Sequence, residues 1–318
     1  MIISASRRTD IPTYYSDWFF NRIKEKYVLV RNPMNIHQVS RIDLSPNIVD
    51  CIVFWTKNPK PMLEKLDHLQ DYKYYFQFTL NSYDKDVEAN LPPKATEVIE
   101  TFKRLSDKIG REKVIWRYDP IFLSDKYTIL YHIEHFEKFA KLLSGYTEKC
   151  TISFMDFYSK INNNIRDLNI TPMQLSDKKM LAESLSKIAA NYDLKMDTCA
   201  EDIELIDFGI THASCIDAKL ISRIIDCPID VEKDKNQRLE CGCVSSIDIG
   251  LYNTCLNGCK YCYANHSLNT VKKNAAKYNK KSPLLCGEIE QKDVISDRDV
   301  KSFKISQLSL FSDDFGTK

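Results

Sequence analysis

Glycine is scarce in this sequence, with 8 among 318 residues, and neither GxGxxG nor GxxxxGK[ST] occurs. A glycine-rich loop for nucleotide phosphates is therefore not indicated. No apolar run approaches the roughly 20 residues of a membrane span. The first ten residues, MIISASRRTD, lack the apolar stretch of a signal peptide. We therefore expect a cytoplasmic protein with no membrane partner.

Net charge is also nearly absent, because 45 Lys and Arg residues offset 44 Asp and Glu residues, leaving +1. This balance gives no support for nucleic acid as a partner, although a local basic patch is compatible with it. We expect the substrate to be a small molecule or a peptide.

Cysteine, by contrast, is abundant, with 11 residues. Thiols stay reduced in the cytoplasm, so these residues are metal ligands, reactive groups or small buried side chains rather than a disulfide framework. Cys51 and Cys150 lie inside apolar runs, which is typical of core residues.

Short β-branched and aromatic runs alternate with amphipathic segments along the chain, which favours parallel βαβ units. The expected strands are 2–6, 47–55, 74–80, 113–118, 150–157, 193–197 and 245–251, with a hairpin over 27–44. The pattern predicts an α/β fold with a TIM-like parallel barrel, partial or full, over residues 1–270; an open doubly wound sheet is the alternative. We expect residues 271–318 to form an extension that wraps the barrel or is partly mobile.

Polar and charged residues follow nearly every expected strand. In a parallel barrel the carboxyl ends of all strands meet on one face, where ligands bind. The candidates for catalysis at these ends are Lys57, Arg117 and Asp119. An internal ion pair is an equal interpretation of Arg117 and Asp119.

The segment YNTCLNGCKYCYAN, residues 252–265, contains Cys255, Cys259 and Cys262. Its C-x3-C-x2-C spacing is uncommon for zinc, and bacterial ferredoxins use C-x2-C-x2-C. Three thiolates on a [4Fe–4S] cube would leave one iron open for a small molecule, with the ring of Tyr261 beside it. Gly242, Gly250 and Gly258 lie near these cysteines, which fits a bound cofactor without requiring one.

This spacing resembles the CxxxCxΦC signature of the radical S-adenosylmethionine (SAM) superfamily, with Tyr261 at the aromatic position. The segments IISASRRTDIP, VFWTKNP, WRYDP, CGC and DIGLYNTCLNGCKYCYAN resemble a bacterial family, domain of unknown function 1848, whose C-terminus carries such a cluster. The resemblance implies a [4Fe–4S] cluster, SAM cleavage to a 5′-deoxyadenosyl radical, and an electron donor such as flavodoxin or ferredoxin.

The superfamily carries these cysteines after the first barrel strand, whereas here they follow the last. We therefore predict a circular permutation that places the last strand beside the first, with Arg7, Arg8 and Asp10 facing the cluster. The Gly-Gly-Glu segment that holds the SAM amino group in the superfamily is absent. Asp10 is the candidate for the ammonium and Arg7 or Arg8 for the carboxylate; Gly287-Glu288 is a weaker candidate.

Four further cysteines form a second group of candidates: Cys199, Cys215, Cys241 and Cys243. They could hold a second iron–sulfur cluster or a zinc ion, or be small reduced residues near a crowded site. Two other functions remain open at this stage. One is a non-catalytic iron–sulfur or zinc protein for electron transfer, sensing or structure, and the other is a barrel enzyme in which the cysteines are incidental.

Overall fold

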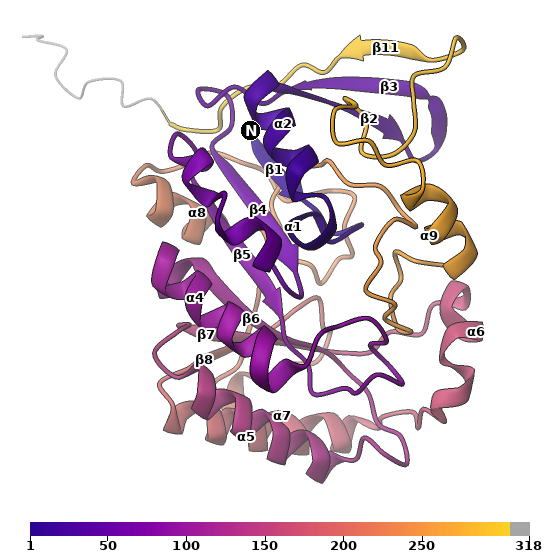
Figure 1. Cartoon of the computed structure of the whole chain (residues 1–318). Coiled ribbons are helices and arrows are strands. Elements are labelled where there is room, and N and C mark those ends of the chain that lie inside the picture. The colour runs from indigo at the N-terminus through magenta and orange to yellow at the C-terminus, as the bar shows by residue number, and fades with distance from the viewer. Residues whose placement is uncertain (306–318) are drawn as a thin grey trace, which may run out of the picture.

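Eight parallel strands form the main sheet in the computed structural model, which describes residues 1–305 (Figure 1). In spatial order they are β10 (Ile247–Asp248), β1 (Ile2–Ala5), β4 (Cys51–Thr56), β5 (Tyr74–Thr79), β6 (Val114–Ile121), β7 (Lys149–Phe154), β8 (Lys195–Thr198) and β9 (Thr211–His212). All seven ladders between them are parallel. The expectation of an α/β protein with a parallel sheet is therefore confirmed.

The last strand of this sheet lies beside the first, as expected. Ile3 is opposite Ile247 and Ser4 is opposite Asp248 in the β1–β10 ladder. From β1 to β9 the spatial order otherwise follows the chain. The sheet ends at β9 and β10, and no ladder joins these two strands within residues 1–305.

Several helices pack on one face of the sheet and complete the main core, whereas α8 (Ala218–Ile225) packs on the other face. The helices of the described residues are α1 (Ile11–Tyr14), α2 (Ser16–Glu25), α3 (Lys60–Leu63), α4 (Ile99–Ile109), α5 (Ile129–Leu143), α6 (Asn162–Ile165), α7 (Leu175–Asn191), α8 and α9 (Leu268–Ala275). Of these, α2, α4, α5 and α7 contribute fully buried side chains to the main core. The apolar stripe of α4 is followed by Gly110 at φ +95°, which ends the helix.

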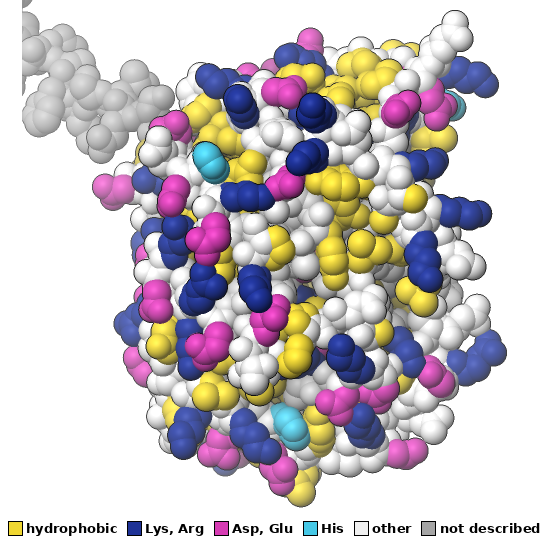
Figure 2. All heavy atoms as spheres, in the orientation of Figure 1, with side chains coloured by type: hydrophobic (Ala, Val, Ile, Leu, Met, Phe, Trp, Pro, Cys, Tyr) yellow, Lys and Arg dark blue, Asp and Glu magenta, His cyan; other side chains and the backbone are white. Residues whose placement is uncertain are grey.

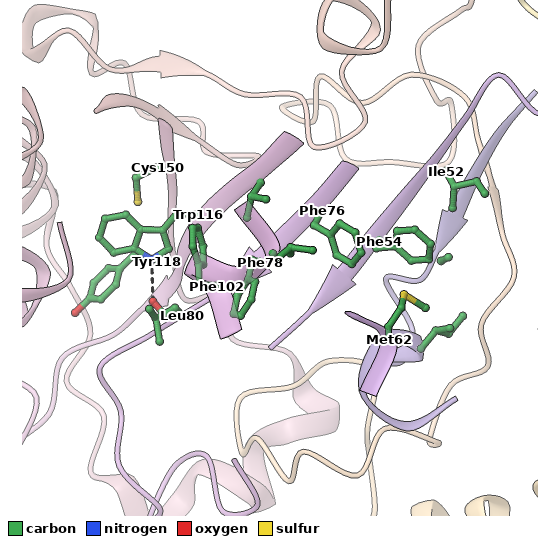
Figure 3. Close-up of a cluster of buried hydrophobic side chains, with 14 of the residues drawn as sticks. Ile52, Phe54, Met62, Phe76, Phe78, Leu80, Phe102, Trp116, Tyr118 and Cys150 are labelled. Atoms are coloured by element: carbon green, nitrogen blue, oxygen red, sulfur yellow. Dashed lines mark hydrogen bonds between the residues drawn. The ribbon is translucent and has the colours of Figure 1, made fainter. Parts of the chain in front are cut away.

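Aromatic side chains on alternate positions of the strands fill this core. Phe54 and Phe76 stack with ring centroids 4.7 Å apart, and Phe78 packs on Phe102 of α4 (Figure 3). The indole of Trp116 donates a hydrogen bond to the carbonyl of Leu80 at 3.0 Å. Cys51 and Cys150 are fully buried, so their expected place in the core is confirmed.

The opposite face of the sheet carries a smaller apolar cluster. Ile2, Val53, Tyr75 and Ile115 point to this side, because side chains alternate along a strand. They pack with α8 and with several of the cysteines that follow the sheet. Polar residues at the carboxyl end of this same face therefore lie close to those thiols.

A three-stranded sheet of β2 (Tyr27–Asn32), β3 (Asn35–Asp43) and β11 (Val294–Asp297) lies apart from the main sheet (Figure 1). The antiparallel β2–β3 pair confirms the expected hairpin. The C-terminal extension returns to it, because β11 pairs with β3 in parallel. The rest of the extension, residues 306–318, lies outside the described residues.

Candidate metal and ligand site

A cavity of about 880 Å³ lies at the carboxyl ends of the strands. Ligand sites of enzymes usually occupy about 300–1,000 Å³, so this volume can hold a cofactor and part of a substrate. All candidate residues from the sequence except Gly287-Glu288 line it, namely Arg7, Arg8, Asp10, Lys57, Arg117, Asp119, Cys199, Cys215, Cys241, Cys243, Cys255, Cys259, Tyr261 and Cys262. The structure therefore brings together residues that are far apart in the sequence.

The cysteine loop, residues 252–265, lies against the segment 86–91. Glu88 and Cys259 form an isolated antiparallel bridge. The Lys260 amide donates to the Val87 carbonyl at 3.0 Å, and the Asn90 amide donates to the Asn257 carbonyl at 3.1 Å. This backbone pairing fixes the middle of the loop, where Cys255 and Cys259 are each 9% exposed.

Asp10 ties the same loop to the end of β1. One carboxylate oxygen accepts hydrogen bonds from the Thr13 amide at 3.0 Å and the Thr56 hydroxyl at 2.8 Å. The other accepts from the Lys57 amide at 2.8 Å and from the Asn257 side-chain amide at 3.0 Å. Asp10 thus caps α1, orients the end of β4 and holds the loop, and only 5% of its surface is exposed.

A second aspartate, Asp248, joins the ends of β10 and β1. It accepts from the hydroxyls of Ser4 and Ser6 at 2.6 Å each and from the Arg7 amide at 2.8 Å. Gly250 follows two residues later, and a Cβ there would fall 2.0 Å from the Ser6 hydroxyl. Glycine is therefore needed where the segment after β10 approaches the end of β1 this closely.

A buried carboxylate, Glu88, lies at the centre of a charge network beside Cys259. It pairs with Lys57 at 2.7 Å and Lys94 at 2.5 Å, and it accepts a hydrogen bond from the Tyr261 hydroxyl. Lys57 also lies 5.4 Å from the centre of the Tyr261 ring. The loop aromatic is thus held from both its ring face and its hydroxyl.

The pKa values in this network follow from burial and the opposing charges. Burial would raise the pKa of Glu88, but Lys57 and Lys94 hold it below its usual value. Burial would lower the pKa of Lys57, but Glu88 and the nearby Cys259 thiol raise it. Glu88 also raises the pKa of Lys94, but not enough to offset the effect of burial, so the pKa of Lys94 is lowered.

Sequence analysis missed Glu88 and Lys94. They lie in a polar connecting segment, and Glu88 is buried by contact with the cysteine loop, more than 160 residues further along the chain, while Lys94 is held by Glu88.

The three loop thiols are neighbours on the cavity wall. Burial raises the pKa of all three, and that of Cys259 to about 12, while Lys57 acts in the opposite direction on Cys259 and Cys262. Within residues 1–305 no three or more His, Cys, Asp or Glu side chains surround a single point as ligands of one metal ion. The thiolates of an iron–sulfur cube bind different irons, so they need no such common point. The donor set, three thiols facing one cavity, fits a cluster with one open iron.

Arg7 and Arg8 line the cavity from the end of β1. The guanidinium of Arg8 lies 5.1 Å from the centre of the Tyr252 ring and 3.9 Å from Asp248. Arg7 lies 3.7 Å from Asp234 and over the ring of Trp55. The ion pairs of both arginines are long, at 3.7 and 3.9 Å, so their N–H groups can still donate hydrogen bonds to a ligand in the cavity.

Arg117 and Asp119, at the end of β6, form an ion pair. Arg117 also donates to the Gln77 side chain at 3.3 Å and to the Cys215 sulfur at 2.8 Å, and it is 5% exposed. The predicted ion pair between Arg117 and Asp119 is therefore confirmed. The same pair lines the cavity, where it could also meet a substrate.

The other four cysteines on the wall gather in one place. The sulfurs of Cys199 and Cys215 are 3.2 Å apart. The Cys243 thiol interacts with those of Cys215 and Cys241, and its hydrogen bond lowers the pKa of Cys241 to about 7. We call these four residues the four-thiol cluster.

Comparison with known proteins identifies one match. A family model described as Domain of unknown function (DUF1848) matches residues 2–264. No curated protein and no solved structure matches the chain. Among the described residues, no helix combines the length and apolar character needed to cross a membrane.

Proposed function

The chain belongs to the DUF1848 family, and we propose that it is a radical SAM enzyme whose cluster is held by Cys255, Cys259 and Cys262. One observation carries the proposal. Three thiols with the spacing C-x3-C-x-Tyr-C face a cavity lined by charged residues from the ends of most strands. Three thiols can hold three irons of a four-iron cluster. The fourth iron is then left free to bind a second molecule.

When bound, a [4Fe–4S] cluster carrying SAM supplies one-electron cleavage of the sulfonium and a 5′-deoxyadenosyl radical for hydrogen abstraction. The chain's own residues hold and shield these groups. Lys57 favours the thiolate form of Cys259, which iron binding requires. Tyr261, fixed by Glu88 and Lys57, covers one side of the loop.

In this proposal the carboxylate of SAM lies near Arg7 or Arg8. Their guanidinium groups can still form the bidentate hydrogen bonds that carboxylates prefer. Asp10 remains the candidate for the SAM ammonium, but its oxygens already accept four hydrogen bonds. An ammonium can bind there only if Lys57 or Asn257 gives up its contact.

The same proposal includes a barrel-like sheet that is circularly permuted relative to other radical SAM enzymes. The order β10-β1-β4 supports it, since a last strand beside the first is what a permuted chain requires. The cavity at the carboxyl ends of the strands is the usual place for the active site of such a sheet.

We propose a small molecule or a peptide as substrate, bound near Arg117 and Asp119, with flavodoxin or ferredoxin as electron donor. Basic and acidic side chains are interspersed on the face seen in Figure 2. This face therefore shows none of the clustered positive charge that nucleic acids bind.

Anaerobic reconstitution with iron and sulfide tests the proposal. The wild type should bind a cluster with an EPR signal that changes on adding SAM, and should release 5′-deoxyadenosine with dithionite. Cys255→Ala should lose both properties. Cys227→Ala is the matched control, because Cys227 does not line the cavity.

Two results would count against this function. A reconstituted protein whose loop cluster never yields 5′-deoxyadenosine would indicate a non-catalytic iron–sulfur protein. Zinc on the loop thiols after expression in metal-balanced medium would indicate a zinc protein instead.

A further inference from the structure

We propose that the four-thiol cluster (Cys199, Cys215, Cys241 and Cys243) is a second metal centre, separate from the cysteine loop, which fastens the two ends of the main sheet together. The inference does not rest on the proposed function, because none of the loop thiols takes part in it.

The thiols form a continuous chain of contacts. Cys199 and Cys215 have their sulfurs 3.2 Å apart, and Cys243 interacts with Cys215 on one side and Cys241 on the other. The Ile216 amide donates to the Cys243 sulfur at 3.4 Å. In a tetrahedral zinc site with Zn–S bonds of about 2.3 Å, neighbouring sulfurs are about 3.8 Å apart. The sulfurs of Cys199 and Cys215, at 3.2 Å, are nearer to each other than this, so they would have to move slightly apart to bind one metal.

Backbone pairing brings the thiols together from three segments. The Ala213 amide donates to the Thr198 carbonyl at 2.7 Å, which aligns the segments of Cys199 and Cys215. The Val244 amide donates to the Ile216 carbonyl at 3.1 Å, which aligns Cys215 with Cys243. The proximity therefore follows from the path of the chain.

Gly242, between the last two cysteines, permits this approach. A Cβ at this position would fall 2.5 Å from the Ser214 hydroxyl and 3.1 Å from the Ala213 carbonyl oxygen. The Ser214 hydroxyl donates to the Gly242 carbonyl at 2.7 Å. Gly242 thus allows the backbone between Cys241 and Cys243 to pack against Ala213 and Ser214, which brings both thiols near Cys215.

Contacts between thiols, together with burial, raise the pKa of Cys199, and they raise those of Cys215 and Cys243 to about 11, while Arg117 acts in the opposite direction on Cys199 and Cys215. Arg117 donates to the Cys215 sulfur at 2.8 Å, and Arg7 lies close enough to Cys243 and Cys215 to interact with their charges. A metal with four thiolates carries net negative charge, which these cations would offset.

The location explains what the centre would do. Cys215 follows β9, and Cys241 and Cys243 precede β10, so the cluster spans the two strands at which the sheet ends. The thiols do not yet surround one point, and metal binding would draw them around it by rotation of their side chains. A metal bound by all four thiolates has no open position, so its role would be structural.

The test is metal analysis of variants purified anaerobically from medium containing zinc and iron. The triple variant Cys255→Ala, Cys259→Ala, Cys262→Ala should retain a stoichiometric metal. Adding Cys241→Ser and Cys243→Ser should abolish it, whereas adding Cys227→Ala should not. Zinc without sulfide would identify a single ion, and iron with acid-labile sulfide would identify a cluster.

Two metal analyses would overturn the inference: a triple variant free of metal, or metal that persists without Cys241 and Cys243. Since those substitutions could also prevent folding, thiol alkylation of the triple variant provides a second measurement. The four thiols should be protected together and become reactive together after chelation, while Cys227 reacts throughout. Protection that chelation does not change, or a Cys199–Cys215 disulfide in the isolated protein, would equally refute a metal centre.

Discussion

The charge network around Glu88 makes a prediction about stability that can be worked out from the structure. Glu88→Gln removes the charge but keeps the size of the side chain. Lys57 and Lys94 would then face each other with side chains only 12% and 16% exposed and no carboxylate between them. Breaking a buried ion pair costs about 3–5 kcal/mol, because the remaining charge is left without a partner in a poor solvent.

We expect the lower end of that range, about 3 kcal/mol, for two reasons. Glutamine keeps one oxygen that can accept a hydrogen bond from a lysine, and both lysines retain some contact with water. A loss of about 3 kcal/mol lowers the folding equilibrium constant on the order of 100-fold. The assay is urea unfolding of chelator-treated, reduced protein, followed by circular dichroism, so that metal binding does not contribute.

The matched control is Glu97→Gln. Glu97 pairs with Lys60 at 3.3 Å, with side chains 34% and 52% exposed, so its loss should cost less than about 1 kcal/mol. Should Glu88→Gln be no more destabilising than Glu97→Gln, the network would not be a stabilising buried pair and the reasoning above would be wrong.

Two further predictions concern the core. Phe76→Ala should lower the free energy of unfolding by about 3–5 kcal/mol in urea titrations, because it leaves a cavity beside Phe54 in a fully buried stack; a loss below about 1 kcal/mol would contradict the packing. His132 is fully buried, and burial lowers its pKa to about 4. Its folded-state pKa lies below the unfolded value, so its contribution is complete above about pH 6.5 and falls by about 3 kcal/mol towards pH 4. NMR titration should find its imidazole neutral down to about pH 4; protonation near pH 6.5 would refute this.

The main sheet was accessible from the sequence because its strands are runs of apolar residues with strong β propensity. Segment 51–56, CIVFWT, and segment 74–79, YYFQFT, are clear examples. The position of the last strand was also predictable, since a cluster after that strand could serve a site at the first strand only if the two were neighbours. The Ile3–Ile247 pairing confirms that the two strands are neighbours.

The parts that sequence reasoning missed depend on contacts between distant segments. β9 has only two residues, too few for any periodic pattern, and it exists because Thr211 and His212 pair with β8. β11 is exposed along its length and pairs with β3 from a lysine-rich tail. Strands defined by such pairing leave no local signal in composition or hydrophobic period.

Asp10 is a carboxylate at a strand end whose position was predicted correctly, but whose hydrogen bonds indicate a structural role and not the predicted binding of a ligand. Its position beside the cysteine loop agrees with the sequence argument, but one of its four hydrogen bonds is its own helix cap contact and the other three come from two further segments, the end of β4 and the cysteine loop, and hold them in register. A carboxylate saturated in this way has little capacity left for a mobile ligand, because each new contact must replace an existing one. The buried network around Glu88 supports another part of the same loop. Two carboxylates therefore fix the cysteine loop, Asp10 through Asn257 and Glu88 through Tyr261. Arg7 and Arg8, which follow β1 and make only long ion-pair contacts, have more capacity than Asp10 to meet a ligand in the cavity.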